Sequence, residues 1–483
     1  MTVEAAETTQ DMSLLTISET ISAVSGRCLC SKEAADNFSF LDVVIDSRNA
    51  NNGSLFVPLT GESQDGHDFI RAALKNGASV VFVSQKNYER TDSLIMELQR
   101  EYPLAVFIVV KDTLVALQSL AAEYVKKFPL LTKIGVTGSS GKTTTKEIIA
   151  AVLSKRFSVV MNEGNFNSET GLPLSVFRIR EQHQVGVFEM GMNRKNEIQE
   201  LADVLNPDLA VVTNIGCAHV GRLGSVDAIA QEKKCIFSNF SNDSVAFVPE
   251  DDKYSSFLVD GIYGKTVFFG KNLVAQIKDA GVQGTDFVLD ELKIHFSLPG
   301  YGNFLDAMAA VAVAKELGCS SAEIKEGLES VKPLFGRTQI IKGKAATVIQ
   351  DCYNANPDSM MQALNFLDSI EADGQKVAIL GDMLELGHES SAAHVEIIGK
   401  ALDSSINFVV CVGEQMCKAV DSVESSGKKE ADVFCFSDIS DAGMKLVCDF
   451  LKDKIRPNDV VLLKGSRGIQ LERLVPVLAG DVA

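Results

Sequence analysis

The sequence has no long apolar stretch, and this absence excludes a protein with membrane-spanning helices. A spanning helix needs about 18 or more predominantly apolar residues, whereas the longest candidates here are LAVFIVV (residues 104–110) and AMAAVAVA (residues 307–314). The N-terminal stretch MTVEAAETTQDM is acidic and has no basic segment followed by an apolar one, which argues against a secretory signal. We therefore predict a cytoplasmic protein.

Basic residues and closely spaced cysteines are also scarce. The chain has 46 Lys and Arg residues against 64 Asp and Glu residues, and its net charge of −18 argues against nucleic acid as a partner. The ten cysteines include no C-x-x-C pair and no metal-like spacing, so we interpret them as buried thiols in a reducing compartment. The 483 residues, 46% of them hydrophobic, can fill several cores. This length predicts about three domains.

A glycine-rich loop lies between a β-rich run and a helical run. Residues 133–145 read KIGVTGSSGKTTT, and the helical stretch KEIIAAVLSK follows. Glycines let backbone N–H groups converge on phosphate oxygens, the helix N-terminus adds its dipole, and Lys142 can reach the terminal phosphates. Val136 stands where the G-x-x-x-x-G-K-[ST] pattern has its first glycine, so the loop is of a shorter G-x-x-G-K-T type. The alternative is a flexible turn that happens to contain GKT.

Helical and β-rich runs alternate along the chain and predict an α/β fold with three domains. We expect a small α/β domain at residues 1–109, a central phosphate-loop domain with a mostly parallel sheet at residues 110–332, and a Rossmann-like domain at residues 333–483. The third has five β-rich runs but no G-x-G-x-x-G turn, so a dinucleotide cofactor is not indicated. The short runs between residues 240 and 298 are expected to form antiparallel, peripheral strands.

Chemically competent side chains follow directly after two further predicted strands. Glu189 ends the strand in QVGVFEMG, and His219 follows the strand LAVVTN. The carboxyl ends of parallel strands form the ligand crevice of such a sheet, so we expect these side chains and the phosphate loop to share a site. Glu189 could hold Mg²⁺ beside a nucleotide. A buried, capped glutamate is the alternative for Glu189, and a structural histidine is the alternative for His219.

Cations that could contact an anionic substrate lie at other strand ends. Lys464 and Arg467 follow a buried run, and their position favours anion contact over the alternative of solvated surface charge. Arg48 follows the run VVIDS, where the local sequence by itself favours a surface salt bridge.

Ten motifs together resemble the ATP-dependent Mur ligases of peptidoglycan synthesis in order and spacing. They are TGSSGKTT, GNFNSETGLP, FEMG, NIGCAHVGRLGS, QEKKCIF, LPGYGN, GRTQ, DCYNANPDSM, LGDMLELG and KGSRG. The resemblance covers nearly the whole chain, and DCYNANPDSM and GDMLELG match the branch that joins D-alanyl-D-alanine to UDP-N-acetylmuramoyl-tripeptide. It implies a monomeric enzyme that takes these two small molecules and ATP and makes the UDP-muramyl-pentapeptide.

The resemblance implies a role for each matching residue. The ATP-binding set is Thr137, Gly138, Ser139, Ser140, Gly141, Lys142, Thr143, Thr144, Asn303, Arg337 and Asp351. The substrate-binding set is Ser47, Arg48, Asn165, Asn167, Asn354, Asn356, Lys464 and Arg467. The catalytic set is Lys142, Glu189, His219 and Lys233. Two Mg²⁺ ions would be held by Thr143, Glu189, His219 and Lys233, the last as a carbamate formed from CO₂. Lys234 is the competing carbamate position, although the spacing to Phe237 favours Lys233.

Three positions depart from the family pattern. Gly302 stands in place of a histidine, and Asp306 and Ser168 stand in place of asparagines. These departures concern the adenine-side and peptide-loop contacts and leave the phosphate and metal positions intact. The implied reaction passes through an acyl phosphate made from ATP and a peptide carboxylate.

Two other functions remain possible from the sequence. A sibling ligase, including a folylpolyglutamate synthase-like enzyme, would add a single amino acid instead of a dipeptide. A phosphate-loop switch would hydrolyse nucleotide without an acceptor. For a guanine-nucleotide switch we would also expect an N-K-x-D motif, which the chain lacks.

Overall fold

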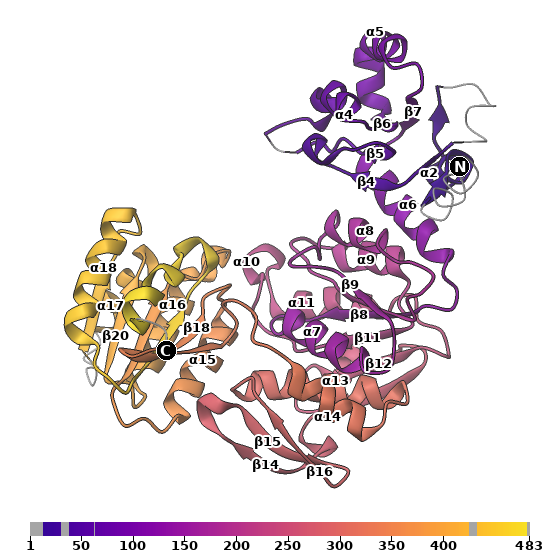
Figure 1. The fold of residues 1–483 in the computed structure, drawn as a ribbon. Helices are drawn as coiled ribbons and strands as arrows, with labels where there is room; N and C mark the ends of the chain where they lie inside the picture. Colours follow the sequence, from indigo (N-terminus) through magenta and orange to yellow (C-terminus); the bar gives the residue numbers. More distant parts are fainter. Residues whose placement is uncertain (1–12, 30–37, 62, 425–431, 481–483) are drawn as a thin grey trace, which may run out of the picture. The chain divides into compact units, whose positions relative to one another are not determined.

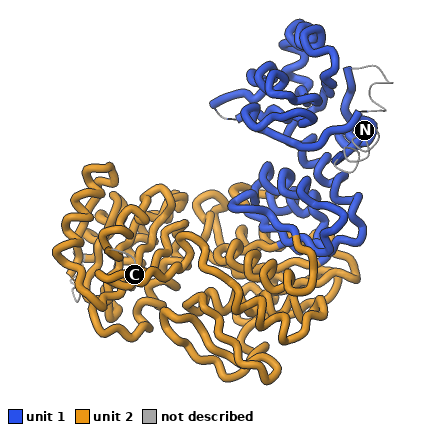
Figure 2. Tube along the Cα trace, viewed as in Figure 1, with its two compact units in different colours: residues 1–135, 160–191, 197–208 blue, residues 136–159, 192–196, 209–483 orange. Residues whose placement is uncertain are grey.

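The computed structural model describes residues 13–29, 38–61, 63–424 and 432–480 (Figure 1). The chain divides into two compact units (Figure 2). Unit 1 comprises residues 1–135, 160–191 and 197–208, and unit 2 comprises residues 136–159, 192–196 and 209–483. The stretch MTVEAAETTQDM, on which the expectation about a secretory signal rests, lies outside the described residues.

Unit 1 begins with a five-stranded sheet of order β2-β7-β6-β5-β4, in which β2 is antiparallel to β7 and the other neighbours are parallel. The run VFIVV forms β7 and is buried at every position, as expected for a central parallel strand covered on both faces. The elements of this first part of unit 1 are β1 (Leu15–Thr16), α2 (Ile17–Val24), β2 (Arg27–Cys28), β3 (Ser39–Phe40), β4 (Asp42–Val44), β5 (Ser54–Phe56), α4 (Ile70–Lys75), β6 (Val80–Ser84), α5 (Gln85–Glu101), β7 (Val106–Val110) and α6 (Thr113–Lys126).

The boundary between the units falls inside β8 (Thr132–Thr137). In unit 1, the first residues of β8 are followed across the sheet by β10 and then β9. The run VGVFE forms β10 and is buried throughout, so Glu189 ends a fully apolar strand as predicted. The further elements are β9 (Val159–Met161), α8 (Gly171–Val176), β10 (Val185–Glu189) and α9 (Glu197–Leu205).

In unit 2, the end of β8 continues across the sheet as β11, β12 and β13. The expectation that the runs VAFVPE and TVFFG are antiparallel is wrong, because β12 pairs in parallel with both β11 and β13. The short helix α12 between them provides the crossover that a parallel connection requires. These elements are β11 (Leu209–Val212), α10 (Val220–Leu223), α11 (Val226–Lys234), β12 (Val245–Pro249), α12 (Ser255–Val259) and β13 (Lys265–Phe269).

Helices α13 and α14 pack against the helix of the phosphate loop, α7 (Lys142–Leu153). α13 (Tyr301–Glu316) is rich in alanine and is buried from Ala307 to Ala314, because small side chains let helices approach closely. α14 (Ser321–Ser330) begins with a capping box between Ser320 and Glu323. The predicted antiparallel strands are present at β14 (Ala275–Asp279), β15 (Thr285–Leu289) and β16 (Leu292–Phe296).

Residues 339–480 of unit 2 form a Rossmann-like layer with sheet order β17-β18-β22-β19-β20-β21. Five strands are parallel, as predicted, and the edge strand β17 is an antiparallel addition. Its core lies on both faces of the sheet, under the helices labelled in Figure 1. The elements are β17 (Gln339–Lys342), β18 (Ala346–Asp351), α15 (Pro357–Ser369), β19 (Lys376–Gly381), α16 (Ser390–Leu402), β20 (Phe408–Val412), α17 (Glu414–Glu424), β21 (Asp432–Phe436), α18 (Asp441–Lys454), β22 (Asp459–Lys464) and α19 (Val475–Ala479).

Parallel sheets flanked by helices confirm the predicted α/β class. Among the described helices, none combines the length and apolar character needed to cross a membrane. Eight described cysteines are free, but only Cys319, Cys352 and Cys411 of these are buried, so the interpretation of all cysteines as buried thiols is wrong. Cys435 is exposed, and Cys28 is disulfide-bonded.

Candidate active site

The loop from Gly138 to Gly141 leads from β8 into α7, as the sequence predicts. Gly138 and Gly141 have φ angles of 154° and 78°, in the region that favours glycine. A Cβ atom on Gly138 would lie 1.8 Å from the Thr213 hydroxyl oxygen, so a side chain at this position would collide with the strand end beneath it. These residues therefore form a tightly packed loop at a helix N-terminus. The alternative, a flexible turn, does not describe them.

The strand end after β11 fixes the shape of the phosphate loop. The Thr213 hydroxyl donates to the Ser140 carbonyl oxygen at 2.6 Å, and the Ser140 backbone N–H donates to Asn214 Oδ1 at 3.0 Å. Ser139 donates its backbone N–H to the Asn214 carbonyl oxygen at 3.0 Å. Sequence analysis did not assign Thr213 or Asn214 a role, although both end a predicted strand, where site residues are expected.

Lys142 and Thr143 lie in the first turn of α7. The side chain of Arg337, from the segment after α14, contacts this turn. Lys142 Nζ donates to the Gly138 carbonyl oxygen at 2.9 Å. One Arg337 nitrogen donates to the Thr143 hydroxyl oxygen at 3.0 Å, and the guanidinium lies over the Tyr353 ring at 4.3 Å from its centroid. The structure thus brings Arg337 into contact with Thr143, a predicted ATP-binding residue 194 positions earlier in the sequence.

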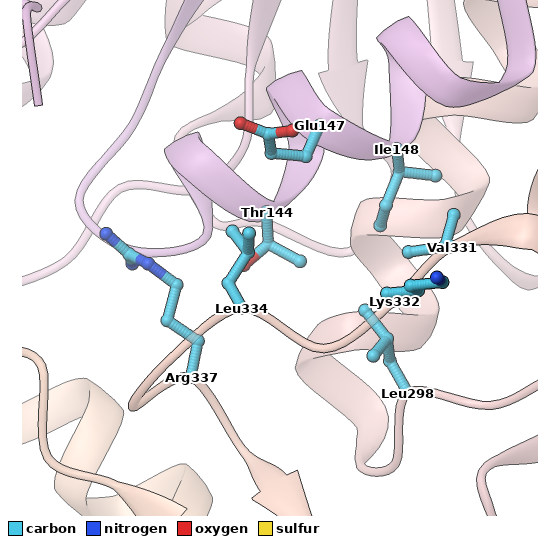
Figure 3. Close-up of a pocket in the computed structure, with 8 residues that line it drawn as sticks. All are labelled: Thr144, Glu147, Ile148, Leu298, Val331, Lys332, Leu334 and Arg337. Carbon is cyan, nitrogen blue, oxygen red and sulfur yellow. The ribbon is translucent and has the colours of Figure 1, made fainter. Parts of the chain in front are cut away.

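A pocket lies beside these residues, between α7 and the segment that follows α14. In Figure 3 the Arg337 side chain extends toward the start of α7. The volume of this pocket, about 10 Å³, corresponds to a single water molecule, so the pocket by itself is too small for a nucleotide. The lining residues are Thr144, Glu147, Ile148, Leu298, Val331, Lys332, Leu334 and Arg337.

His219 is a half-buried, neutral imidazole in unit 2, with a side chain that is 19% exposed. Burial lowers its pKa from 6.5 to about 3, and the positive charges of Lys142, Lys233 and Arg222 contribute further. Its Nδ1 atom is buried and has no hydrogen-bond partner among the described residues. A Glu385 carboxylate oxygen is 3.7 Å from Nδ1, and with an uncharged imidazole this contact is not an ion pair near neutral pH. An unsatisfied imidazole nitrogen beside the phosphate loop is chemically suited to a cation.

Lys233 and Lys234 lie at the end of α11 in different surroundings. Lys233 is 1% exposed and its charge acts on His219. Lys234 instead donates from Nζ to the backbone carbonyl oxygens of Phe257 and Asp260 at 2.8 and 2.6 Å.

Glu189 belongs to unit 1, where it lies with the asparagine-rich loop. Asn167 Nδ2 donates to Glu189 Oε1 at 2.6 Å, and the Glu189 backbone N–H donates to Asn162 Oδ1 at 2.9 Å. The Asn167 backbone N–H donates to the Asn165 carbonyl oxygen at 2.7 Å. Within unit 1 the structure thus gathers three predicted site residues, and Asn162 is a member of the cluster that sequence analysis missed.

Three predicted residues meet at the carboxyl end of the C-terminal sheet. Lys464 is only 4% exposed, so it is not a solvated surface charge. Its Nζ atom lies 2.8 Å from Asp351 Oδ2 and donates to the Asn354 carbonyl oxygen at 3.1 Å. Arg467 is half-exposed and pairs with Glu472 at 2.7 Å, with its guanidinium over the Phe335 ring.

The remaining predicted residues make local contacts. Asn303 Nδ2 donates to the Pro299 carbonyl oxygen at 2.7 Å, and Asn356 Oδ1 caps α15 by accepting the Ser359 N–H at 2.9 Å. In unit 1, Arg48 follows Ser47. The Arg48 side chain is 87% exposed and pairs with Asp46 at 2.5 Å. The surface salt bridge favoured by the local sequence is thus present.

Comparison with known proteins identifies the family. Three domain families match the chain in order: Mur ligase family, catalytic domain, over residues 42–125; Mur ligase middle domain, over residues 136–314; and Mur ligase, glutamate ligase domain, over residues 336–467. The chain is 43% identical to the UDP-N-acetylmuramoyl-tripeptide–D-alanyl-D-alanine ligase of Treponema pallidum (strain Nichols), over 96% of this chain and 99% of that protein.

Two solved structures are similar over nearly the full length. MurF from Acinetobacter baumannii has a TM-score of 0.84 and 28% identity, covering 98% of this chain and 100% of that chain. MurF ligase from Thermotoga maritima in complex with ADP has a TM-score of 0.76 and 28% identity, covering 91% and 97%. The identity to the Treponema pallidum protein along almost the whole of both sequences, with three domain matches in order, shows that the chain belongs to the Mur ligase family.

Proposed function

We propose that this chain is an ATP-dependent ligase that joins D-alanyl-D-alanine to UDP-N-acetylmuramoyl-tripeptide and so makes the UDP-muramyl-pentapeptide precursor of peptidoglycan. The observation that carries the proposal is the 43% identity, along almost the full length, to a relative of that name. The phosphate loop at the N-terminus of α7 supports a nucleotide triphosphate as co-substrate, as does the ADP bound by the Thermotoga maritima relative.

The first turn of α7 is the proposed phosphate cradle. Its N–H groups have no acceptors within the helix, and the helix dipole favours an anion there. Lys142 would exchange the Gly138 carbonyl oxygen for the β and γ oxygens of ATP. Arg337 would give up its hydrogen bond to the Thr143 hydroxyl and contact the nucleotide instead. The Thr143 hydroxyl could then bind a cation. The aspartate near Lys464, Asp351, is the proposed ribose contact.

We assign Thr143, Glu189 and His219 to hold two Mg²⁺ ions. Such ions, when bound, supply Lewis-acid stabilisation to a phosphoryl group in transfer. The residues fit this role because burial keeps His219 neutral, and its Nδ1 lone pair has no partner among the described residues. Mg²⁺ prefers oxygen ligands, so the hydroxyl of Thr143 and the carboxylate of Glu189 suit it better than the imidazole alone.

We further propose that Lys233 is carbamylated. Its amine would add CO₂ and release a proton, which would give a carboxylate-like group at a fully buried position. The charge of Lys233 acts on His219, so a carbamate there would add an oxygen ligand on the His219 side of the site to those of Thr143 and Glu189.

The carbamate predicts that activity depends on bicarbonate. Enzyme prepared without CO₂ should regain turnover when bicarbonate is added, and Lys233→Ala should lose turnover without recovery. Lys234→Ala is the matched variant. If it removes the bicarbonate response while Lys233→Ala does not, the carbamate belongs to Lys234.

The proposed reaction has two steps. The terminal carboxylate of the tripeptide attacks the γ-phosphorus of ATP, the bond to the ADP oxygen breaks, and an acyl phosphate forms. The amine of D-alanyl-D-alanine then attacks the acyl carbon, phosphate leaves, and the amine loses a proton. Water must be kept from the acyl phosphate, since hydrolysis would waste it. Asn165, Asn167, Asn354, Asn356, Ser47, Arg48 and Arg467 remain the proposed contacts of the two substrates.

A panel of acceptors tests the function. Phosphate release is measured with ATP, each UDP-muramyl-tripeptide (with diaminopimelate or lysine as third residue), and either D-alanyl-D-alanine, single amino acids or no acceptor. The proposal expects release only with the dipeptide. Release with single amino acids would identify a sibling ligase, and acceptor-independent release would identify a nucleotide switch.

Because one chain supplies every proposed residue, and because ATP and UDP-linked sugars are cytoplasmic metabolites, we propose a cytoplasmic monomer.

A further inference from the structure

Asp306 on α13 places a buried carboxyl group directly against the phosphate loop. The residue is 7% exposed, and its Oδ1 atom accepts a hydrogen bond from the Thr145 hydroxyl at 2.8 Å. A Cβ atom on Gly141 would lie 2.4 Å from Asp306 Oδ1, so the carboxyl also touches the last glycine of the loop. Thr145 donates its backbone N–H to the Gly141 carbonyl oxygen at 2.8 Å, which completes a compact unit of three residues.

The charge of an ionised Asp306 would be only partly compensated. α13 packs against α7, β12, β13, α14, α15 and the turn at Lys271–Leu273. Two cations nearest in sequence to the loop are engaged elsewhere, since Lys142 bonds the Gly138 carbonyl oxygen and Lys146 pairs with Glu147 at 3.0 Å. The other charged residues on these elements are Lys265, Lys271, Glu323, Lys325, Glu326, Glu329, Asp358 and Asp368.

Arg337 is the cation whose charge acts on Asp306, and burial outweighs it. Burial raises the pKa of Asp306 from 3.8 to about 7, while the Thr145 hydrogen bond and the Arg337 guanidinium lower it. The free protein therefore holds Asp306 near the midpoint of its titration at neutral pH.

A bound nucleotide triphosphate would change this balance in one direction. It would bring several negative charges to the loop that the carboxyl touches, and like charges close together favour the neutral form of an acid. It would also draw Arg337, in the proposed function, toward the nucleotide. Both effects favour the protonated carboxyl, which keeps its place under Gly141 without repelling the phosphates.

We propose that Asp306 takes up a proton from solvent when a nucleotide triphosphate binds the phosphate loop, so that nucleotide affinity in this chain is linked to pH through Asp306. The proposal rests on the proposed function in that it requires the loop to bind a triphosphate. Asp306 is a positioning residue here, because it acts through Gly141 and Thr145 and not on the reacting atoms.

Calorimetry with ATP and Mg²⁺ on the full-length protein tests this linkage. If the bound form is fully protonated, the dissociation constant of wild-type protein should rise about 25-fold from pH 6.5 to pH 8.5, because affinity falls with the protonated fraction. In Asp306→Asn the rise should be smaller by that factor. Since ATP titrates in the same range with both proteins, the ratio of the two dissociation constants at each pH isolates Asp306. Exposed Asp421→Asn is the matched control and should follow wild type.

Proton uptake gives a second readout that needs no variant. Binding enthalpies of the wild type at pH 8, measured in two buffers with different ionisation enthalpies, should report about one proton taken up per ATP beyond that of ATP itself. A ratio of dissociation constants that stays constant with pH, or no proton uptake at pH 8, would overturn the proposal. Failure of the proposed function is distinguishable, because it would appear in the acceptor panel as release without the dipeptide, while the calorimetry measures ATP binding alone.

Discussion

Lys142 is the residue whose removal should affect chemistry most and folding least. Its ammonium group lies at the N-terminus of α7, where it donates to the Gly138 carbonyl oxygen at 2.9 Å. In Lys142→Ala we expect kcat/KM for ligation to fall by about 100-fold or more, the usual cost of removing a group that stabilises charge in a transition state. The melting temperature should change little. Phosphate release and thermal melts measure the two effects.

The control for Lys142 is Lys155, near the other end of the same helix, which pairs with exposed Glu326 at 3.1 Å. Lys155→Ala should keep wild-type turnover, since an exposed ion pair contributes about 1 kcal/mol or less. Near-normal turnover of Lys142→Ala would contradict the assignment of residues 138–144 to the triphosphate.

Asp306 should also make the stability of the free protein depend on pH. Its pKa is about 7 in the folded chain and near 3.8 when exposed, so between these values the folded state binds more protons than the unfolded state. The contribution of Asp306 is therefore greatest at low pH and is lost as pH rises through about 7. From pH 6 to pH 8, wild-type stability should fall by about 1 kcal/mol more than that of Asp306→Asn. Thermal or urea unfolding at both pH values measures this difference, and parallel pH profiles would contradict it.

Individual site residues were predictable where a local sequence pattern indicates them. Gly138, Gly141 and Lys142 belong to one short motif, and Glu189 ends an apolar run. Thr213 and Glu385 were missed because their contacts, with the Ser140 carbonyl oxygen and near His219, join segments 73 and more residues apart. No local periodicity carries such pairings.

At the scale of elements, Asn356 separates a structural role from a substrate role. Its side chain closes a capping box at the start of α15, where loss of the cap costs about 1 kcal/mol. Asn356→Ala should lower the melting temperature, and Asn356→Asp should restore it because aspartate caps equally well. If Asn356 also contacts the dipeptide, as proposed, the KM for D-alanyl-D-alanine should rise in both variants. A normal KM in Asn356→Asp would mean that Asn356 caps α15 and does not contact the dipeptide.

Most elements follow from composition and periodicity, and the errors concern strand partners. The five parallel strands of the C-terminal sheet were predicted from apolar runs alternating with helices. β17 was not, because QIIK is short and only half-buried. β12 and β13 were recognised as strands but given the wrong direction, since the five-residue helix between them is too short for its periodicity to stand out.

At the scale of the whole molecule, the predicted family and α/β class are confirmed, whereas the domain limits at residues 109 and 332 stay predictions. What could not be predicted is how the C-terminal layer contacts the phosphate-loop side of unit 2. The backbone of Leu386 and Gly387 lies against Gly221, and Glu385 pairs with Arg222 at 3.3 Å. These contacts join residues more than 160 positions apart, so they depend on the folded surfaces of both parts.

Gly221 gives a test of that contact. A Cβ atom there would lie 2.6 Å from the Leu386 carbonyl carbon and oxygen, so alanine would push residues 385–387 away from His219 and Arg222. Overpacking of this kind costs about 1–3 kcal/mol, so we expect Gly221→Ala to lower kcat/KM by about 10-fold, since each 1.4 kcal/mol is a factor of ten. Gly399→Ala in α16 is the matched control. No atom lies within 4 Å of its added Cβ, and alanine should leave turnover unchanged. Wild-type turnover in Gly221→Ala would mean that ligation does not require this contact.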